Sequence, residues 1–146
     1  MRVLGIDLGS KRIGIAVSDR SGVIASPLTV VARSGSVEQD HRRIAALVTE
    51  EEAIRVVVGL PLSMDGSMGP AAKAAVAEAA KLASVVGVPV ETYDERLTTV
   101  TADRSMMEAR MRAEARRRIV DKIAAAVMLQ AWLDGPNGQA ARDALR

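Results

Sequence analysis

Two short apolar runs at the start of the chain, separated by only a few polar residues, constrain the fold more than any other feature. Residues 3–8 and 13–17 each have the length and composition of a buried strand. Gly9 and Ser10 lie between them and are typical turn residues. So short a connection favours an antiparallel hairpin, which is the expected beginning of the fold.

The remainder of the chain alternates between strand-like and helix-like patterns. A third strand is expected at residues 23–31, with a break at Pro27. Ser36 is a suitable N-cap for the first helix. The further predicted strands are 55–60 and 88–93, and the predicted helices are 37–52, 71–86, 98–112 and 114–133.

This order predicts an α/β domain with a central mixed β-sheet flanked by helices. Three antiparallel strands come first, and βαβ crossovers follow them. A chain of 146 residues has the length of one domain. We expect residues 1–134 to form that domain and residues 135–146 to form a C-terminal tail, either mobile or folded as a short docked helix.

The composition excludes several kinds of active site. The chain has no cysteine, so disulfides, thiolate metal sites and a cysteine nucleophile are excluded, in agreement with a reducing compartment. Its one histidine, His41, lies in a polar stretch, and we interpret it as a solvated helix residue. No signal-peptide pattern and no apolar run of membrane-spanning length is seen, so we expect a cytoplasmic protein without a membrane partner.

One acidic residue interrupts the first apolar run. Asp7 is predicted to lie in a buried strand, where a carboxylate costs free energy unless it is paired or binds a cation. This position favours a functional role. The structural alternative is a turn cap through Ser10 or an ion pair with Lys11.

Two further acidic positions lie far along the chain from Asp7. Asp94 and Glu95 follow the strand predicted at 88–93, and residues just past a strand end are a favoured site location in α/β folds. The alternative is an exposed turn paired with Arg96. Asp121 precedes the apolar part of the last helix, and its alternative is an ion pair with a basic residue one helical turn earlier.

Converging carboxylates would form a site for a hard divalent cation. Mg²⁺ and Mn²⁺ take oxygen ligands and often keep water molecules that a phosphate can replace. Two such ions can activate water and stabilise the leaving oxygen during phosphodiester cleavage. The acidic positions therefore favour a metal-dependent phosphodiesterase.

A cluster of cations near the start of the last helix suits a phosphate backbone, although a solvated helical face is the alternative. The chain has only two aromatic residues, Tyr93 and Trp132, which disfavours sequence-specific stacking on single-stranded bases. Recognition of backbone and shape fits better. The cluster comprises Arg110, Arg112, Arg116, Arg117, Arg118 and Lys122.

Four motifs, in order along the chain, resemble those of the bacterial YqgF/RuvX family. The resemblance covers residues 1 to about 134. It implies an RNase H-like fold related to Holliday-junction resolvases, and a cytoplasmic nuclease that matures the 5′ end of pre-16S ribosomal RNA with Mg²⁺ or Mn²⁺. Family members are also described as resolving DNA junctions. The motifs are GIDLGSKRIGIAVSD at 5–19, VGLPLSMDGS at 58–67, DERLTT at 94–99 and DKIAA at 121–125.

The resemblance also assigns site residues. It places the catalytic and metal-binding carboxylates at Asp7, Glu95 and Asp121, with Asp94 as a candidate fourth ligand. Asp7 would bridge two metal ions, and Glu95 and Asp121 would each hold one. The residues expected to contact nucleic acid are Lys11, Arg12, Arg96, Arg110, Arg112, Arg116, Arg117 and Arg118, and residues 59–67 are expected to form a loop at the rim of the cleft.

Two other classes of function compete with this reading. The first hairpin resembles the phosphate-binding hairpin of actin-like ATPases, but one domain of this length lacks their second lobe. A non-catalytic nucleic-acid-binding module would use the same basic residues but would gain nothing from carboxylates facing phosphates.

Junction cleavage on two symmetric strands would need a homodimer.

Overall fold

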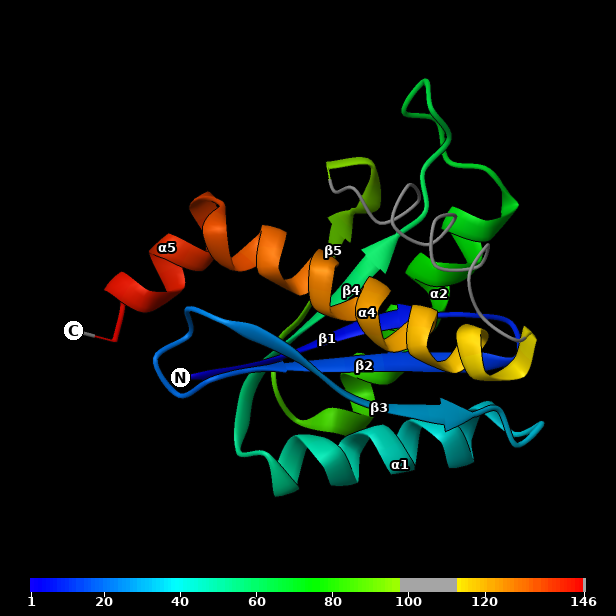
Figure 1. Ribbon diagram of the computed structural model, residues 1–146, viewed down its shortest axis with the longest axis horizontal. Coiled ribbons are helices and arrows are strands. Elements are labelled where there is room, and N and C mark those ends of the chain that lie inside the picture. The colour runs from blue at the N-terminus through cyan, green and yellow to red at the C-terminus, as the bar shows by residue number, and fades with distance from the viewer. Residues whose placement is uncertain (98–112, 146) are drawn as a thin grey trace.

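The computed structural model describes residues 1–97 and 113–145 and shows a five-stranded mixed sheet covered by helices on both faces (Figure 1). The strand order is β3-β2-β1-β4-β5. The α/β architecture predicted from the sequence is confirmed. The strands are β1 (Arg2–Leu8), β2 (Arg12–Ser18), β3 (Ala25–Ala32), β4 (Ala53–Leu60) and β5 (Val90–Asp94).

The predicted N-terminal meander is present. β1 pairs with β2 and β2 pairs with β3, both antiparallel, while β1–β4 and β4–β5 are parallel pairs. The β2–β3 register shifts where Ala16 faces Pro27, because proline has no N–H to donate to a ladder. β3 is an edge strand, where such an irregularity is tolerated.

The helices follow the predicted order. They are α1 (Val37–Glu50), α2 (Pro70–Val86), α4 (Ala113–Asp134) and α5 (Pro136–Asp143), with a short 3₁₀ helix η1 (Glu95–Leu97) after β5. Ser36 caps α1 by accepting a hydrogen bond from the Gln39 N–H, as expected. The predicted helix at 98–112 lies outside the described residues.

Two apolar clusters hold the layers together. One packs α1 and α2 against the sheet through Leu4, Ile15 and Val58, and the other packs α4 against the opposite face through Val3 and Ala16. Figure 1 shows α4 crossing the near face of β1 and β2. Alternate residues of each strand therefore face α4, which decides where the acidic side chains of the sheet can point.

The last residues fold back as the short docked helix. The Arg142 guanidinium donates 2.8 Å hydrogen bonds to the carbonyl oxygens of Gly22 and Leu133, which fasten α5 to the β2–β3 turn and to the end of α4. No helix in the described parts of the chain has the length and apolar character needed to cross a membrane.

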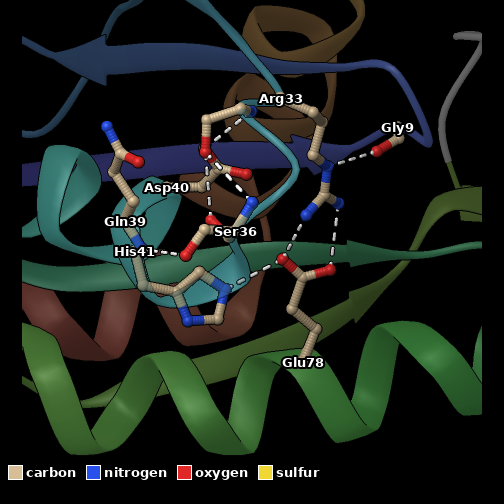
Figure 2. Close-up of polar contacts among 8 residues, drawn as sticks. Gly9, Arg33, Ser36, Gln39, Asp40, His41 and Glu78 are labelled. Atoms are coloured by element: carbon tan, nitrogen blue, oxygen red, sulfur yellow. Dashed lines mark hydrogen bonds and ion pairs between the residues drawn. The ribbon is translucent and has the colours of Figure 1, made fainter.

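The interpretation of His41 as a solvated residue is wrong. Its side chain is 2 % exposed, and its Nε2 lies 2.8 Å from Oε2 of Glu78 on α2 (Figure 2). The polar residues around His41 in sequence suggested solvent, but α1 packs on α2, which buries this side chain. A carboxylate contributed by another helix satisfies the buried ring.

Candidate functional site

Asp7 lies near the end of β1 on the face covered by α4. Val3 of the same strand packs in the α4 cluster, and residues 3, 5 and 7 share that face because side chains alternate along a strand. Asp7 is half-buried rather than fully enclosed. The strand thus directs a carboxylate toward α4 at the point where the sheet begins to open.

Asp121 approaches the same face from α4 and lies over Gly14. Gly14 is the β2 residue that pairs directly with Asp7. A Cβ at position 14 would collide with the main-chain oxygen of Asp121 and would lie 3.3 Å from Asp121 Cβ. Glycine at this position therefore lets α4 descend until Asp121 lies beside Asp7.

Glu95 approaches from the other side and lies over Gly59. Val58 pairs with Ile6, so Gly59, the next residue of β4, lies beside Asp7. A Cβ at position 59 would collide with the Glu95 carboxylate and would lie 3.0 Å from its Cδ. The 3₁₀ helix η1 turns the chain back over the strand end and brings Glu95 there.

These contacts place the three predicted carboxylates in one row across the sheet, which we call the acidic row: Asp121 over β2, Asp7 on β1 and Glu95 over β4. Neighbouring strands lie about 4.8 Å apart, so the row spans roughly 10 Å. Within the described residues, no three acidic or histidine side chains are arranged to hold a single metal ion. The three acids share a face and a row without converging on one point.

A protein cation occupies one end of the acidic row. Arg12 Nε donates a 2.9 Å hydrogen bond to Asp121 Oδ2, and the two side chains are 26 % and 20 % exposed. Asp121 therefore pairs with a residue of β2, while the alternative of a pair with a basic residue one helical turn earlier falls on side chains outside the description. A pocket of about 310 Å³ opens beside it, lined by the β1–β2 turn residues Gly9, Ser10 and Lys11 together with Arg12 and Asp121.

The β1–β2 turn is anchored from the opposite side of the sheet by Arg33. Its Nε donates a 2.9 Å hydrogen bond to the Gly9 carbonyl, and its two terminal nitrogens bind both oxygens of Glu78 at 2.7 and 2.9 Å (Figure 2). Burial alone would raise the pKa of Glu78, but the hydrogen bonds from Arg33 and His41 outweigh it and lower that pKa. An ionised carboxylate thus holds the arginine that holds the turn.

Asp94 has a different environment from Glu95. Tyr93 packs toward α4, so alternation along β5 directs Asp94 to the other face. Its carboxylate binds Arg96, with the shortest contact at 2.7 Å, and this hydrogen bonding lowers the pKa of Asp94. Arg96 also donates to the Met64 carbonyl. Asp94 and Arg96 therefore tie η1 to the loop after β4, and Asp94 as a fourth metal ligand stays a prediction.

The predicted nucleic-acid contacts are described only in part. Lys11 is exposed in the turn, and Arg12 and Arg96 are engaged by carboxylates as above. Arg110 and Arg112 lie outside the described residues. For the three basic residues at the start of α4, the description covers the helix but not the side chains; these are Arg116, Arg117 and Arg118.

The sequence reasoning missed the two glycines that shape the acidic row. Gly14 and Gly59 both fall in predicted strands, and the structure places them in β2 and β4; the rim loop predicted at 59–67 therefore begins too early, because Gly59 and Leu60 belong to β4. The available signal was a glycine inside a strand pattern, which marks a close approach by another part of the chain. Carboxylate oxygens in this arrangement are donors of the type that hard divalent cations prefer.

Comparison with known proteins supports a nuclease. The sequence model of the RuvX family, described as Holliday junction resolvase, matches residues 1–135. A protein of Myxococcus xanthus named "Putative pre-16S rRNA nuclease" is 48 % identical over 134 residues, covering 92 % of this chain and 88 % of its own length. A protein of Pelotomaculum thermopropionicum with the same name is 44 % identical over 144 residues, covering 99 % and 93 %.

Solved structures support the RNase H-like fold. The structure described as Thermus thermophilus RuvC in complex with a Holliday junction substrate aligns with a TM-score of 0.57, covering 94 % of this chain and 97 % of that chain. The two sequences are 19 % identical, so this likeness concerns the fold alone. With the family match along nearly the whole chain, the sequence and the fold agree that this protein belongs to the RuvX family of nucleases.

Proposed function

We propose that this chain is a metal-dependent endonuclease that hydrolyses phosphodiester bonds in structured nucleic acid, with the 5′ end of pre-16S ribosomal RNA as its first candidate substrate. The named relatives support that substrate. The absence of cysteine supports action in the reducing cytoplasm. The observation that carries the proposal is the acidic row, because it gathers on one face three carboxylates that lie far apart in the sequence.

The acidic row fits divalent cations by the chemistry of its donors. Asp7, which stands between the other two acids, would hold the metal together with Asp121 on one side and Glu95 on the other. Mg²⁺ or Mn²⁺ bound there would activate a water molecule, and its positive charge would stabilise the negative charge that develops on the leaving oxygen. Asp94 remains the candidate for an additional ligand from the strand end.

The cations near the acidic row have a complementary role. Lys11 is exposed in the turn, and Arg12 lies against Asp121, so both can meet a phosphate that approaches this end of the row. Arg12, held against Asp121, would be positioned to bind the scissile phosphate. Arg33 fixes the turn that carries both residues and thereby positions them.

The surface favours recognition of shape over bases. Trp132 is 1 % exposed and Tyr93 is partly buried against the α4 cluster, so the two aromatic residues leave little surface for stacking. A folded RNA or a branched DNA, recognised through its phosphates, fits this composition.

A four-way DNA junction is the second candidate substrate. The description of the RuvX family and the fold shared with RuvC favour it. Cleavage at two symmetric strands would require a homodimer, since the described residues of each chain form one acidic row. The molecular mass of the protein–junction complex shows whether two chains bind one junction.

A cleavage panel tests the proposed function. Wild type and Asp7→Asn are incubated with a pre-16S RNA fragment and with a four-way DNA junction, in Mg²⁺, in Mn²⁺ and in EDTA. We expect wild-type cleavage only with metal, and loss of cleavage with retained binding for Asp7→Asn. A wild-type chain that binds these substrates but cleaves none of them in either metal would identify a binding module instead of an enzyme.

A further inference from the structure

We propose that a basic pocket beside the acidic row is a subsite for a backbone phosphate of the substrate strand. This inference rests on the proposed function, and it specifies the course that the substrate strand takes across the protein surface. The pocket has a volume of about 350 Å³ and adjoins the sheet edge formed by β3. Its lining residues are Arg12, Thr29, Val30, Ala32, Arg43 and Lys122.

Three elements each contribute one cation to this pocket. Arg12 comes from β2, Arg43 from α1 and Lys122 from α4, and none of the lining residues is acidic. Within the described residues, Arg43 and Lys122 form no ion pair with a carboxylate. Arg12 is already balanced by Asp121, so Arg43 and Lys122 are the two lining cations that would gain a direct anionic partner from a bound phosphate.

The wall residues of the pocket, and the hydrogen bond that holds Arg43 in place, favour a phosphate over a base. The remaining lining residues are small or aliphatic residues of β3, which offer no aromatic ring for stacking. Arg43 donates a 3.3 Å hydrogen bond from Nη1 to the Ala32 carbonyl, which holds its stem against the edge strand. A guanidinium fixed in this way can still bind a phosphate oxygen through its other nitrogens.

Arg12 connects the pocket to the acidic row. Arg12 lines the pocket and also binds Asp121 at the end of the row, and its strand position pairs with Ala32 of β3. A strand whose scissile phosphate lies over Asp7 can therefore continue past Asp121 and place a neighbouring phosphate in the pocket. The substrate strand is thus expected to leave the row across β2 and β3 toward α1.

Charge-removing variants with matched controls test this subsite. Arg43→Gln and Lys122→Gln, singly and together, are compared with Arg42→Gln and Lys81→Gln, which remove the same charges from exposed positions lining another pocket, one that does not include Arg12. Binding of a fluorescent four-way junction and of a pre-16S RNA fragment is measured in EDTA across a salt series. Arg43→Lys and Lys122→Arg serve as charge-retaining variants.

We expect the Arg43→Gln/Lys122→Gln protein to bind about tenfold or more weakly at low salt, and each lost contact to reduce the salt slope by about 0.7 to 0.9. The charge-retaining variants should bind nearly as wild type, which excludes misfolding as the cause. If wild type binds and cleaves but this double variant matches the Arg42→Gln/Lys81→Gln control, the subsite is wrong and the proposed function stands. A wild-type chain that neither binds nor cleaves would overturn both.

Discussion

Arg12 on β2 and Asp121 on α4, 109 positions apart in the sequence, are joined by a 2.9 Å hydrogen bond from the guanidinium Nε to the carboxylate Oδ2. Asp121 is one of the three acids of the acidic row. A protein cation therefore holds one end of the row where the proposed function requires a metal ion. Under the proposed function, metal binding and this ion pair would compete for the same carboxylate.

Replacing Arg12 should separate metal binding from substrate binding. In Arg12→Gln, Asp121 loses its competing cation, so Mn²⁺ should bind more tightly. An ion pair of this exposure contributes about 0.2 to 1 kcal/mol, which corresponds to an increase in affinity of up to about fivefold. Nucleic-acid binding should weaken, because a phosphate contact is lost. Calorimetric titration with Mn²⁺ and anisotropy with a junction measure the two effects.

Arg20→Gln is the matched control for this variant, because Arg20 is exposed in the β2–β3 turn and forms no ion pair within the described residues. It should leave both affinities near those of wild type. Weaker Mn²⁺ binding by Arg12→Gln would contradict competition at Asp121.

The two glycines under the acidic row should differ in their response to alanine. In Gly14→Ala the new Cβ meets the main chain of Asp121, which cannot move without shifting α4, so the free energy of unfolding should fall by about 1 to 3 kcal/mol. In Gly59→Ala the Cβ meets the Glu95 carboxylate, the end of a flexible side chain. The stability loss in Gly59→Ala should be smaller, because the carboxylate can turn aside. Alanine also reduces the conformational entropy of the unfolded chain, which stabilises the folded state by about 0.4 to 1 kcal/mol.

Both variants should nevertheless lose cleavage activity, since each displaces one acid of the row. Urea denaturation and initial cleavage rates, measured on the same preparations, check the two parts. Equal stability losses, or full activity in Gly59→Ala, would show that the row is not built on these glycines.

Glu78 should make stability depend on pH in the acidic range. Its folded-state pKa is lowered, so the stability it contributes is complete above its ordinary pKa of 4.5 and is lost as the pH falls through the folded value. Glu78→Gln should cost about 1 to 3 kcal/mol at neutral pH, because Arg33 and His41 lose a charged partner. The difference from wild type should shrink as the pH is lowered below 4.5.

Urea midpoints at several pH values check this expectation, with Glu50→Gln on the exposed end of α1 as the control. A constant difference between wild type and Glu78→Gln at all pH values would mean that the carboxylate charge contributes nothing.

Replacing Asp94 and Glu95 by their amides should lower the cleavage rate to different extents. Glu95→Gln removes an acid from the row and should lower the cleavage rate by about 100-fold or more, equivalent to about 2.7 kcal/mol of transition-state stabilisation. Asp94→Asn loosens Arg96 and the Met64 loop and should lower it by about tenfold or less. Cleavage rates at saturating Mn²⁺ compare the two. An equal loss in Asp94→Asn would establish Asp94 as a further ligand.

The fold was predictable because its signals are local. Apolar runs predict β1, β2 and β4, and Ser36 predicts the start of α1. The helix predicted at 37–52 is two residues too long at its C-terminal end, because α1 ends at Glu50. Boundaries depend on caps and on neighbouring layers, which a local pattern does not contain.

The acidic row was predictable in its members but not in its geometry. A charge inside a buried strand marks Asp7 on physical grounds alone. The pairing of Arg12 with Asp121, and of Glu78 with His41 and Arg33, arises between elements far apart in the sequence and leaves no signal in residue spacing. His41 was wrongly interpreted for this reason, since its burial depends on how α1 meets α2.

The central claim is that the acidic row of Asp7, Glu95 and Asp121 binds divalent metal ions. Titration with Mn²⁺ followed by electron paramagnetic resonance measures it directly, because free and bound ions are distinguished and counted. We predict saturable binding to wild type, together with strongly reduced binding in Asp7→Asn, Glu95→Gln and Asp121→Asn and unchanged binding in Glu50→Gln. Binding of Mn²⁺ to all three row variants with wild-type stoichiometry and affinity would contradict it.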